Sequence, residues 1–168
     1  MSSIFSDINL NKYYQIKSVA NDKYVRFYSF NTKYGNNTGN DNVFVASSDF
    51  GGSKFKFEVS ERLISTVFIY CEGHELYDNR LYSKDFRLNV SNDKDSKSCG
   101  NLTIASESCN RFAELFKIQL NIDGTVSFYS WGLQKWLSAQ NSGKSALIAN
   151  ASIIGKLEKF NLIEALEN

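Results

Sequence analysis

The chain has 168 residues, of which 42% are hydrophobic and 14% aromatic, and this size fits one compact domain with a buried core better than two. Nineteen basic and 18 acidic residues leave a formal net charge of +1, which argues against nucleic acid and anionic membranes as partners. Three cysteines cannot form a complete disulfide framework, and they lack the spacing of a zinc site. We therefore expect a reducing, cytoplasmic environment and no metal or other cofactor.

The N-terminal sequence MSSIFSDINL has no basic segment followed by a long apolar run. No other stretch approaches the length that a membrane-spanning helix needs. We therefore expect neither a signal peptide nor a transmembrane segment, and we predict a single domain over residues 1–168.

Two spacings recur three times along the chain. One separates an apolar residue from an aromatic residue by eight positions, in the pairs Ile16 and Tyr24, Ile69 and Tyr77, and Phe128 and Trp136. The other separates an alanine from a phenylalanine by eleven positions, in the pairs Ala46 and Phe57, Ala105 and Phe116, and Ala149 and Phe160. The two spacings alternate and predict three units, at about residues 12–60, 62–120 and 122–164.

Each unit contains short segments in which apolar and polar residues alternate. The first unit has FKFEV and the second has FKIQL, and alternation of this kind indicates half-buried strands. Loops 31–42 and 91–101 are polar and rich in turn residues, and they are the places where a variable function would lie.

The end of the third unit is ambiguous. In residues 153–167 the apolar side chains could mark one face of a helix. We predict a turn followed by a strand, because the corresponding segments of the first two units read as strands. Three β-units of this size would each expose an apolar face and open edges, so the sequence predicts that they close on one another.

The third unit, DGTVSFYSWGLQKWLSAQNSGKSALIANASIIGKLEKFNLIE, resembles the β-trefoil unit of the fascin and hisactophilin group. In that group a Gly-x-Val strand, a Gly-Lys-Tyr-Leu-Ser-Ala-like strand and a final Glu-Lys-Phe strand follow in the same order. The match spans nearly the whole chain and is strongest in its last quarter. The resemblance implies an all-β trefoil with three pseudo-symmetric four-strand units, in which six strands form a barrel and six form a cap of hairpins.

The segment Gln134-Lys135-Trp136 matches the Q-x-W element of ricin-type lectins in composition. In those lectins the element lies near the end of each unit, whereas here it lies in the middle, and the other units have no glutamine at the matching position. A motif needs its structural context. We therefore interpret Trp136 as an aromatic residue of the core or of its edge.

No catalytic constellation is evident. Cys71 and His74 are close in sequence, but nothing marks an orienting group or an oxyanion site. Gly143-Lys144-Ser145 lacks the first glycine of a phosphate-binding loop and is more typical of a hairpin turn. We expect a binding module and not an enzyme.

Two functions remain open. The resemblance implies an interaction with actin or another protein, for which the surface lysines Lys135, Lys144, Lys156 and Lys159 are the candidates. The single histidine does not fit the many-histidine pH response of hisactophilin. The alternative is a carbohydrate-binding lectin, in which Trp131 would stack on a sugar beside Gln134.

Overall fold

The computed structural model describes residues 7–28, 43–92, 99–105 and 112–166. Loop 31–42 and most of loop 91–101 lie outside these ranges. The described residues form twelve β-strands and two short 3-10 segments: β1 (Tyr14–Ser18), β2 (Tyr24–Tyr28), β3 (Val43–Ser48), β4 (Phe55–Val59), β5 (Val67–Tyr77), β6 (Arg80–Val90), β7 (Leu102–Ile104), β8 (Phe116–Leu120), β9 (Val126–Ser130), β10 (Lys135–Ser138), η2 (Asn141–Gly143), β11 (Ile148–Ala151), η3 (Lys156–Glu158) and β12 (Phe160–Glu164).

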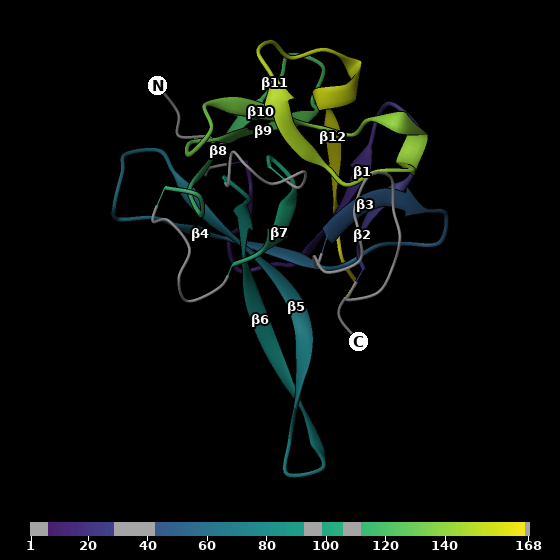
Figure 1. Ribbon diagram of the computed structural model, residues 1–168, viewed down its shortest axis with the longest axis vertical. Helices are drawn as coiled ribbons and strands as arrows, with labels where there is room; N and C mark the ends of the chain where they lie inside the picture. The colour runs from purple at the N-terminus through teal and green to yellow at the C-terminus, as the bar shows by residue number, and fades with distance from the viewer. Residues whose placement is uncertain (1–6, 29–42, 93–98, 106–111, 167–168) are drawn as a thin grey trace.

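Six of the strands close into a barrel (Figure 1). Strand β1 pairs with β4 and β12, β5 pairs with β4 and β8, and β9 pairs with β8 and β12. All six pairings are antiparallel. Because the ring returns to its first strand, it leaves none of the open edges that three separate units would expose.

The other six strands form three hairpins, β2–β3, β6–β7 and β10–β11. Backbone hydrogen bonds link these hairpins to one another: the Leu147 N–H donates to the Phe44 carbonyl at 2.8 Å, and the Leu102 N–H donates to the Leu147 carbonyl at 2.9 Å. Val43 of β3 also pairs with Thr103 of β7. A six-stranded barrel joined to three linked hairpins is the β-trefoil that the sequence predicts.

The strand register identifies the residues that are equivalent among the units. Phe55, Phe116 and Phe160 each begin a barrel strand, and each is fully buried. Each of them also pairs with both neighbouring strands: Phe55 with Tyr14 and Cys71, Phe116 with Val67 and Ser130, and Phe160 with Val126 and Ser18. These three phenylalanines therefore occupy one position of the threefold pattern.

The two recurring spacings each selected one residue that is not equivalent to its counterparts in the other units. The eleven-residue spacing selected Phe57, which lies two residues beyond the true counterpart, Phe55, on the same buried face of β4. The eight-residue spacing selected Tyr77, which lies next to the turn between β5 and β6. The second-unit counterpart of Tyr24 and Trp136 is instead Arg87, because it precedes the buried Leu88 as those residues precede Val25 and Leu137.

The error in the second unit has a simple cause, which is a longer hairpin. Leu88 follows Ile69 by nineteen positions, whereas Val25 follows Ile16 and Leu137 follows Phe128 by nine. The additional residues extend β5 and β6 into a two-stranded ribbon that projects from the body (Figure 1). Its two-residue turn, Asp78-Asn79, has positive φ at both positions, as a type I′ turn requires.

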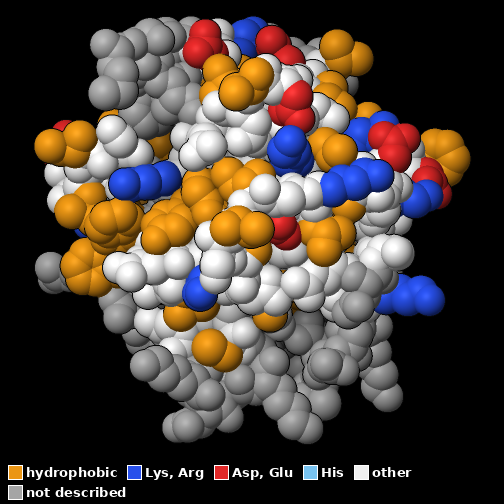
Figure 2. Space-filling view, turned by 90° about the horizontal axis from the view of Figure 1, so that it is seen from above, with side chains coloured by type: hydrophobic (Ala, Val, Ile, Leu, Met, Phe, Trp, Pro, Cys, Tyr) orange, Lys and Arg blue, Asp and Glu red, His pale blue; other side chains and the backbone are white. Residues whose placement is uncertain are grey.

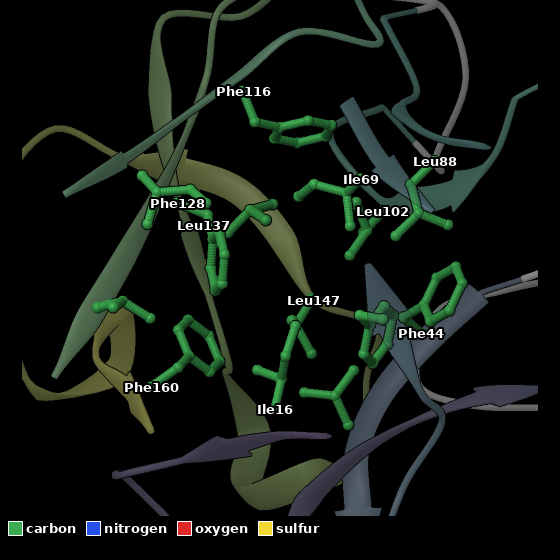
Figure 3. Packing of buried hydrophobic residues seen from close by; sticks show 14 of the residues in the cluster. Ile16, Phe44, Ile69, Leu88, Leu102, Phe116, Phe128, Leu137, Leu147 and Phe160 are labelled. Carbon is green, nitrogen blue, oxygen red and sulfur yellow. The ribbon is translucent and has the colours of Figure 1, made fainter. Parts of the chain in front are cut away.

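The core lies inside the barrel and beneath the cap. Ile16, Ile69 and Phe128 point inward from barrel strands toward Leu137 and Leu147 of the third unit (Figure 3). The Phe128 ring centroid lies 5.6 Å from that of Phe160 and 6.1 Å from that of Phe57. The largest apolar side chains thus come from all three units, and no unit could bury them alone.

The end of the third unit forms η3 followed by β12, which confirms the prediction of a turn and a strand and excludes a long helix there. η3 covers Lys156–Glu158, and β12 pairs along its whole length with β1. This pairing closes the barrel between the last unit and the first.

Candidate functional site

Three aromatic side chains gather on the β9–β10 hairpin of the third unit. The Tyr129 ring lies 5.0 Å from the Trp136 ring and 6.3 Å from the Trp131 ring between centroids, in edge-on geometry in both cases. The Lys117 Nζ of β8 lies 4.6 Å from the Trp131 ring centroid, within the range of a cation–π contact. We call these four residues the aromatic platform.

Strand alternation places the platform outside the core. Phe128 and Leu137 point inward and are each 1% exposed, so their neighbours Tyr129 and Trp136 point to the opposite face and are half-buried. Trp136 is therefore not a core residue, and at this point of β10 Leu137 fills the core. The partial exposure of Trp136 leaves part of its ring available to a ligand.

The sequence analysis named Trp131 and Gln134 as candidates for sugar binding and Lys135 as a candidate for binding a protein. Trp131 belongs to the platform, and Gln134 lies exposed in the turn after it, with a positive φ of 55°. Lys135 alternates with Trp136 along β10 and so belongs to the other face of the strand, where its Nζ donates to the Ser152 Oγ at 2.9 Å. The structure brings only Trp131 of these three into the platform.

The other predicted lysines lie outside the platform. Lys144 is exposed after η2, and Lys156 is exposed at the start of η3. The Lys159 Nζ forms an ion pair with the Asp123 Oδ2 at 3.0 Å. Among the described residues, no contact joins Lys135, Lys144, Lys156 and Lys159 into one surface.

The face that carries β9–β11 at the top of Figure 1 is seen directly in Figure 2. Hydrophobic side chains form a band across this face, and Lys and Arg side chains lie beside it. A band of this kind, with polar groups at its margin, is the surface expected at a shallow recognition site.

A cleft of about 490 Å³ lies where β4 of the first unit meets β5 and β6 of the second, at the base of the projecting ribbon; Leu10, Asn11, Lys56, Phe57, Glu58, Val59, Tyr70 and Asp85 line it. Beside it the Tyr13 hydroxyl donates to both carboxylate oxygens of Asp85 at 3.0 Å. Burial, the hydrogen bond to Asp85 and the nearby carboxylates raise the pKa of Tyr13 to about 12. Glu72 faces Asp85 directly across the ladder, so the cleft has an acidic margin.

The cleft and the platform occupy equivalent places. Lys56 and Glu58 of β4 correspond by register to Lys117 and Gln119 of β8, and Tyr70 corresponds to Tyr129. The position of Trp131 in the third unit is that of Glu72 in the second. The same outer surface is therefore acidic in one unit and aromatic in another.

No known protein family matches the sequence, and no curated protein is significantly similar to it. Among solved structures, the chain is similar to a mosquitocidal holotoxin, with a TM-score of 0.65 and 16% identity over 95% of this chain and 18% of the holotoxin chain. It is also similar to the BEL β-trefoil, with a TM-score of 0.59 and 10% identity over 94% of this chain and 96% of that chain. The chain has the β-trefoil fold.

A third similar structure is a Polyporus squamosus lectin bound to a human-type influenza-binding epitope, with a TM-score of 0.54 and 13% identity over 90% of this chain and 48% of the lectin chain. At identities this low, likeness establishes the fold alone. The trefoil is therefore established, whereas the narrower resemblance to fascin and hisactophilin is not. The chain spans less than half the length of the holotoxin and lectin chains.

The described part of the chain holds neither a metal-binding cluster nor a low-pKa thiol at Cys71. No group of three or more His, Cys, Asp or Glu side chains there could hold a metal ion. Burial raises the pKa of the Cys71 thiol to about 12, which makes a nucleophilic thiolate unfavourable. Within the described ranges, no helix is long and apolar enough to cross a membrane.

Sequence reasoning missed Tyr129, Lys117 and the cleft. Tyr129 and Lys117 fall at the polar positions of alternating strands, so a pattern analysis assigns them to solvent without saying what they meet. Lys117 and Tyr129 are partners across β8 and β9, and this pairing is set by the register of the two strands. Of the platform residues, Trp131 alone could be named from the sequence as a candidate for ligand binding, because it follows a predicted strand.

Proposed function

We propose that the protein is a non-catalytic binding module that binds carbohydrate through the aromatic platform formed by the β9–β10 hairpin and Lys117 of β8. The observation that carries the proposal is the cluster of two tryptophans and one tyrosine, half-buried on the outer face and bordered by a lysine. Apolar faces of sugar rings stack on aromatic rings, while neighbouring polar groups bond to the hydroxyls. Trp131, Tyr129 and Trp136 supply the rings, and Lys117 supplies a donor.

The rings are well suited to this role because their positions are fixed. Trp136 and Tyr129 are cross-strand partners, and the Trp131 backbone N–H donates to the Leu115 carbonyl at 3.0 Å. A rigid platform loses little conformational entropy when a ligand binds. Trefoil neighbours of this chain include a lectin, which supports carbohydrate as a ligand class without assigning a sugar.

The test is glycan binding by the wild type and by Trp131→Ala, first on a glycan array and then by titration calorimetry with the best ligand. We expect Trp131→Ala to lose most of the signal while retaining a cooperative unfolding transition, because Trp131 lies outside the core. Tyr24→Ala is the control for removing an aromatic ring elsewhere, since Tyr24 is half-buried in the first unit and lies outside the platform. Absence of any glycan signal from the folded wild type would refute the proposal.

A protein partner such as actin is the second candidate, and one observation favours it. Ile153 is 78% exposed and Leu157 is 41% exposed, and both lie close in sequence to the exposed Lys156. Apolar side chains beside a cation are suited to a protein surface that carries acidic residues. Co-sedimentation with actin filaments, repeated with Lys144→Glu and Lys156→Glu, tests this function. Sedimentation that the reversals leave unchanged would argue against these lysines.

A further inference from the structure

Lys117 lies where a ligand on the platform would have to approach Trp131. Its Nζ is 4.6 Å from the Trp131 ring centroid, and Lys117 is itself half-buried. A sugar that stacks fully on this ring must move the ammonium group aside. Ligand binding at Trp131 is therefore coupled to the position of this one charge.

The charge of Lys117 has no anionic partner within the described residues. Several other lysines do have one: Lys12 pairs with Glu164, Lys17 with Asp22, Lys23 with Asp49, and Lys159 with Asp123. Within the part of the chain that the structure describes, the Lys117 ammonium lies over the aromatic ring and forms no ion pair, and a cation–π contact uses none of its three N–H groups in a conventional hydrogen bond. These N–H groups remain able to donate to a ligand.

The surroundings of the platform favour a negative ligand. Where the cleft has Glu58 in its lining and Glu72 at its margin, the surface around the platform has Gln119 and Trp131 at the equivalent positions. None of the four platform residues is acidic, and the ammonium of Lys117 is the one charge among them. An incoming carboxylate or sulfate therefore meets no like charge from the platform itself.

The exchange of contacts decides the selectivity. A neutral sugar displaces Lys117 from Trp131 and returns a hydrogen bond from the ammonium to an uncharged oxygen. An anionic sugar displaces it equally but forms an ion pair with it, so the attraction between two opposite charges is added to the hydrogen bond. A cation–π contact at an exposed site is worth only a few-fold in an equilibrium constant, so the second exchange is favourable.

We propose that the platform selects carbohydrates that bear a carboxylate or sulfate group, with Lys117 as the residue that binds the anion. This inference depends on the proposed carbohydrate function and names its ligand class. It makes Lys117 a specificity-determining residue, and the sign of its effect differs between charged and neutral ligands.

The experiment uses an array that presents each neutral glycan beside its sialylated and its sulfated form, followed by calorimetry on the best matched set. We expect the wild type to prefer a charged form by roughly tenfold. Lys117→Gln should remove that preference by weakening charged ligands about fivefold or more while leaving neutral ligands unchanged or slightly tighter. The two charged arms distinguish carboxylate from sulfate.

Lys56→Gln is the matched control, because Lys56 is the first-unit counterpart of Lys117 and its replacement should leave the preference intact. Equal binding of neutral and charged forms, or a preference that survives Lys117→Gln, would overturn the inference and leave the carbohydrate function standing. If the folded wild type binds no glycan, the carbohydrate function itself fails and this inference fails with it.

Discussion

Glu158 links the two segments of the third unit, Leu-Ser-Ala and Glu-Lys-Phe, that resemble the fascin and hisactophilin unit. The Ser138 hydroxyl of the Leu-Ser-Ala segment donates to the Glu158 Oε2 at 2.6 Å, and the Gly155 N–H donates to the Oε1 at 2.9 Å. Glu158 is 7% exposed and Ser138 is fully buried. The carboxylate therefore holds the entry to β12 against β10, and both segments are needed for the contact.

Equivalent contacts occur in the other units with different chemistry. The residue two positions before the threefold-equivalent phenylalanine is Ser53 in the first unit, Glu114 in the second and Glu158 in the third. Each accepts a hydrogen bond from the second strand of its unit. The Phe27 N–H donates to Ser53, the Arg87 guanidinium to Glu114, and the Ser138 hydroxyl to Glu158. The position is thus preserved while the side chains are not, which is why the first two units resemble the pattern more weakly.

Replacing Glu158 by alanine should destabilise the protein by about 1–3 kcal/mol, because it removes the partner of the fully buried Ser138 hydroxyl and of the partly buried Gly155 N–H. Urea unfolding measures the change. Glu164→Ala is the control: Glu164 is exposed, its 3.8 Å ion pair with Lys12 is long, and such pairs contribute about 0–1 kcal/mol. Equal small losses in both variants would contradict the role given to Glu158.

Asp123 gives a prediction for acidic pH. Its Oδ1 accepts hydrogen bonds from the Thr125 N–H and hydroxyl, and its Oδ2 pairs with Lys159. These contacts lower the pKa of Asp123 from 3.8 to about 2. Because the pKa of Asp123 is lower in the folded protein than in the unfolded chain, its contacts stabilise the fold fully at pH values above 3.8. This stabilisation is lost as the pH falls from 3.8 to about 2.

The measurement is the difference in unfolding free energy between the wild type and Asp123→Asn as a function of pH. We expect a constant difference above about pH 5 and a decline toward zero near pH 2. A difference that does not change with pH would show that the contacts act without the charge of Asp123.

At the scale of elements, the second hairpin departs most from its counterparts. Beyond Cys71 on β5 and Leu88 on β6, the two strands form a ladder with each other and with no further described strand. A two-stranded ribbon without other support is of marginal stability. The barrel and the cap should therefore not depend on it.

Deleting residues 74–83 restores the nine-residue interval between Ile69 and Leu88 that the other units have. We expect the shortened protein to fold cooperatively, with a change of no more than about 1 kcal/mol, or about 2–4 °C in Tm. Calorimetry checks this, and Asn79→Gly in the full chain is the control, since Asn79 has a φ of 59° that glycine adopts without strain. Loss of cooperative unfolding in the deletion would mean that the ribbon supports the fold.

At the scale of the whole molecule, threefold closure could be predicted because the apolar residues recur in the same order in every unit. The alignment of the second unit with the other two could not be predicted. The longer hairpin keeps the alternation of inward and outward residues along β5 and β6. It also places Tyr77 eight residues after Ile69, which is the spacing that the true counterpart, Arg87, would have in a hairpin of ordinary length. The outward position of Trp136 depends on which of two neighbours, Trp136 or Leu137, faces the core. Composition alone does not distinguish them, and register does.

The threefold equivalence of Phe55, Phe116 and Phe160 predicts equal roles in stability. Each ring is fully buried and each residue joins two strands of the barrel. Replacing any one of them by alanine should cost about 3–5 kcal/mol, and replacing it by leucine should cost less, since leucine fills more of the cavity. Urea unfolding of the three leucine variants provides the comparison even where an alanine variant does not fold.

We expect the three losses to agree within about 1 kcal/mol, because the same contacts recur around one axis and the sites are too constrained to relax differently. Leu120→Ala, at the exposed end of β8, is the control and should cost little, since Leu120 is 45% exposed. If one phenylalanine could be replaced at little cost while the other two could not, the barrel would be held together by two of its units, and the third would be an appendage to them.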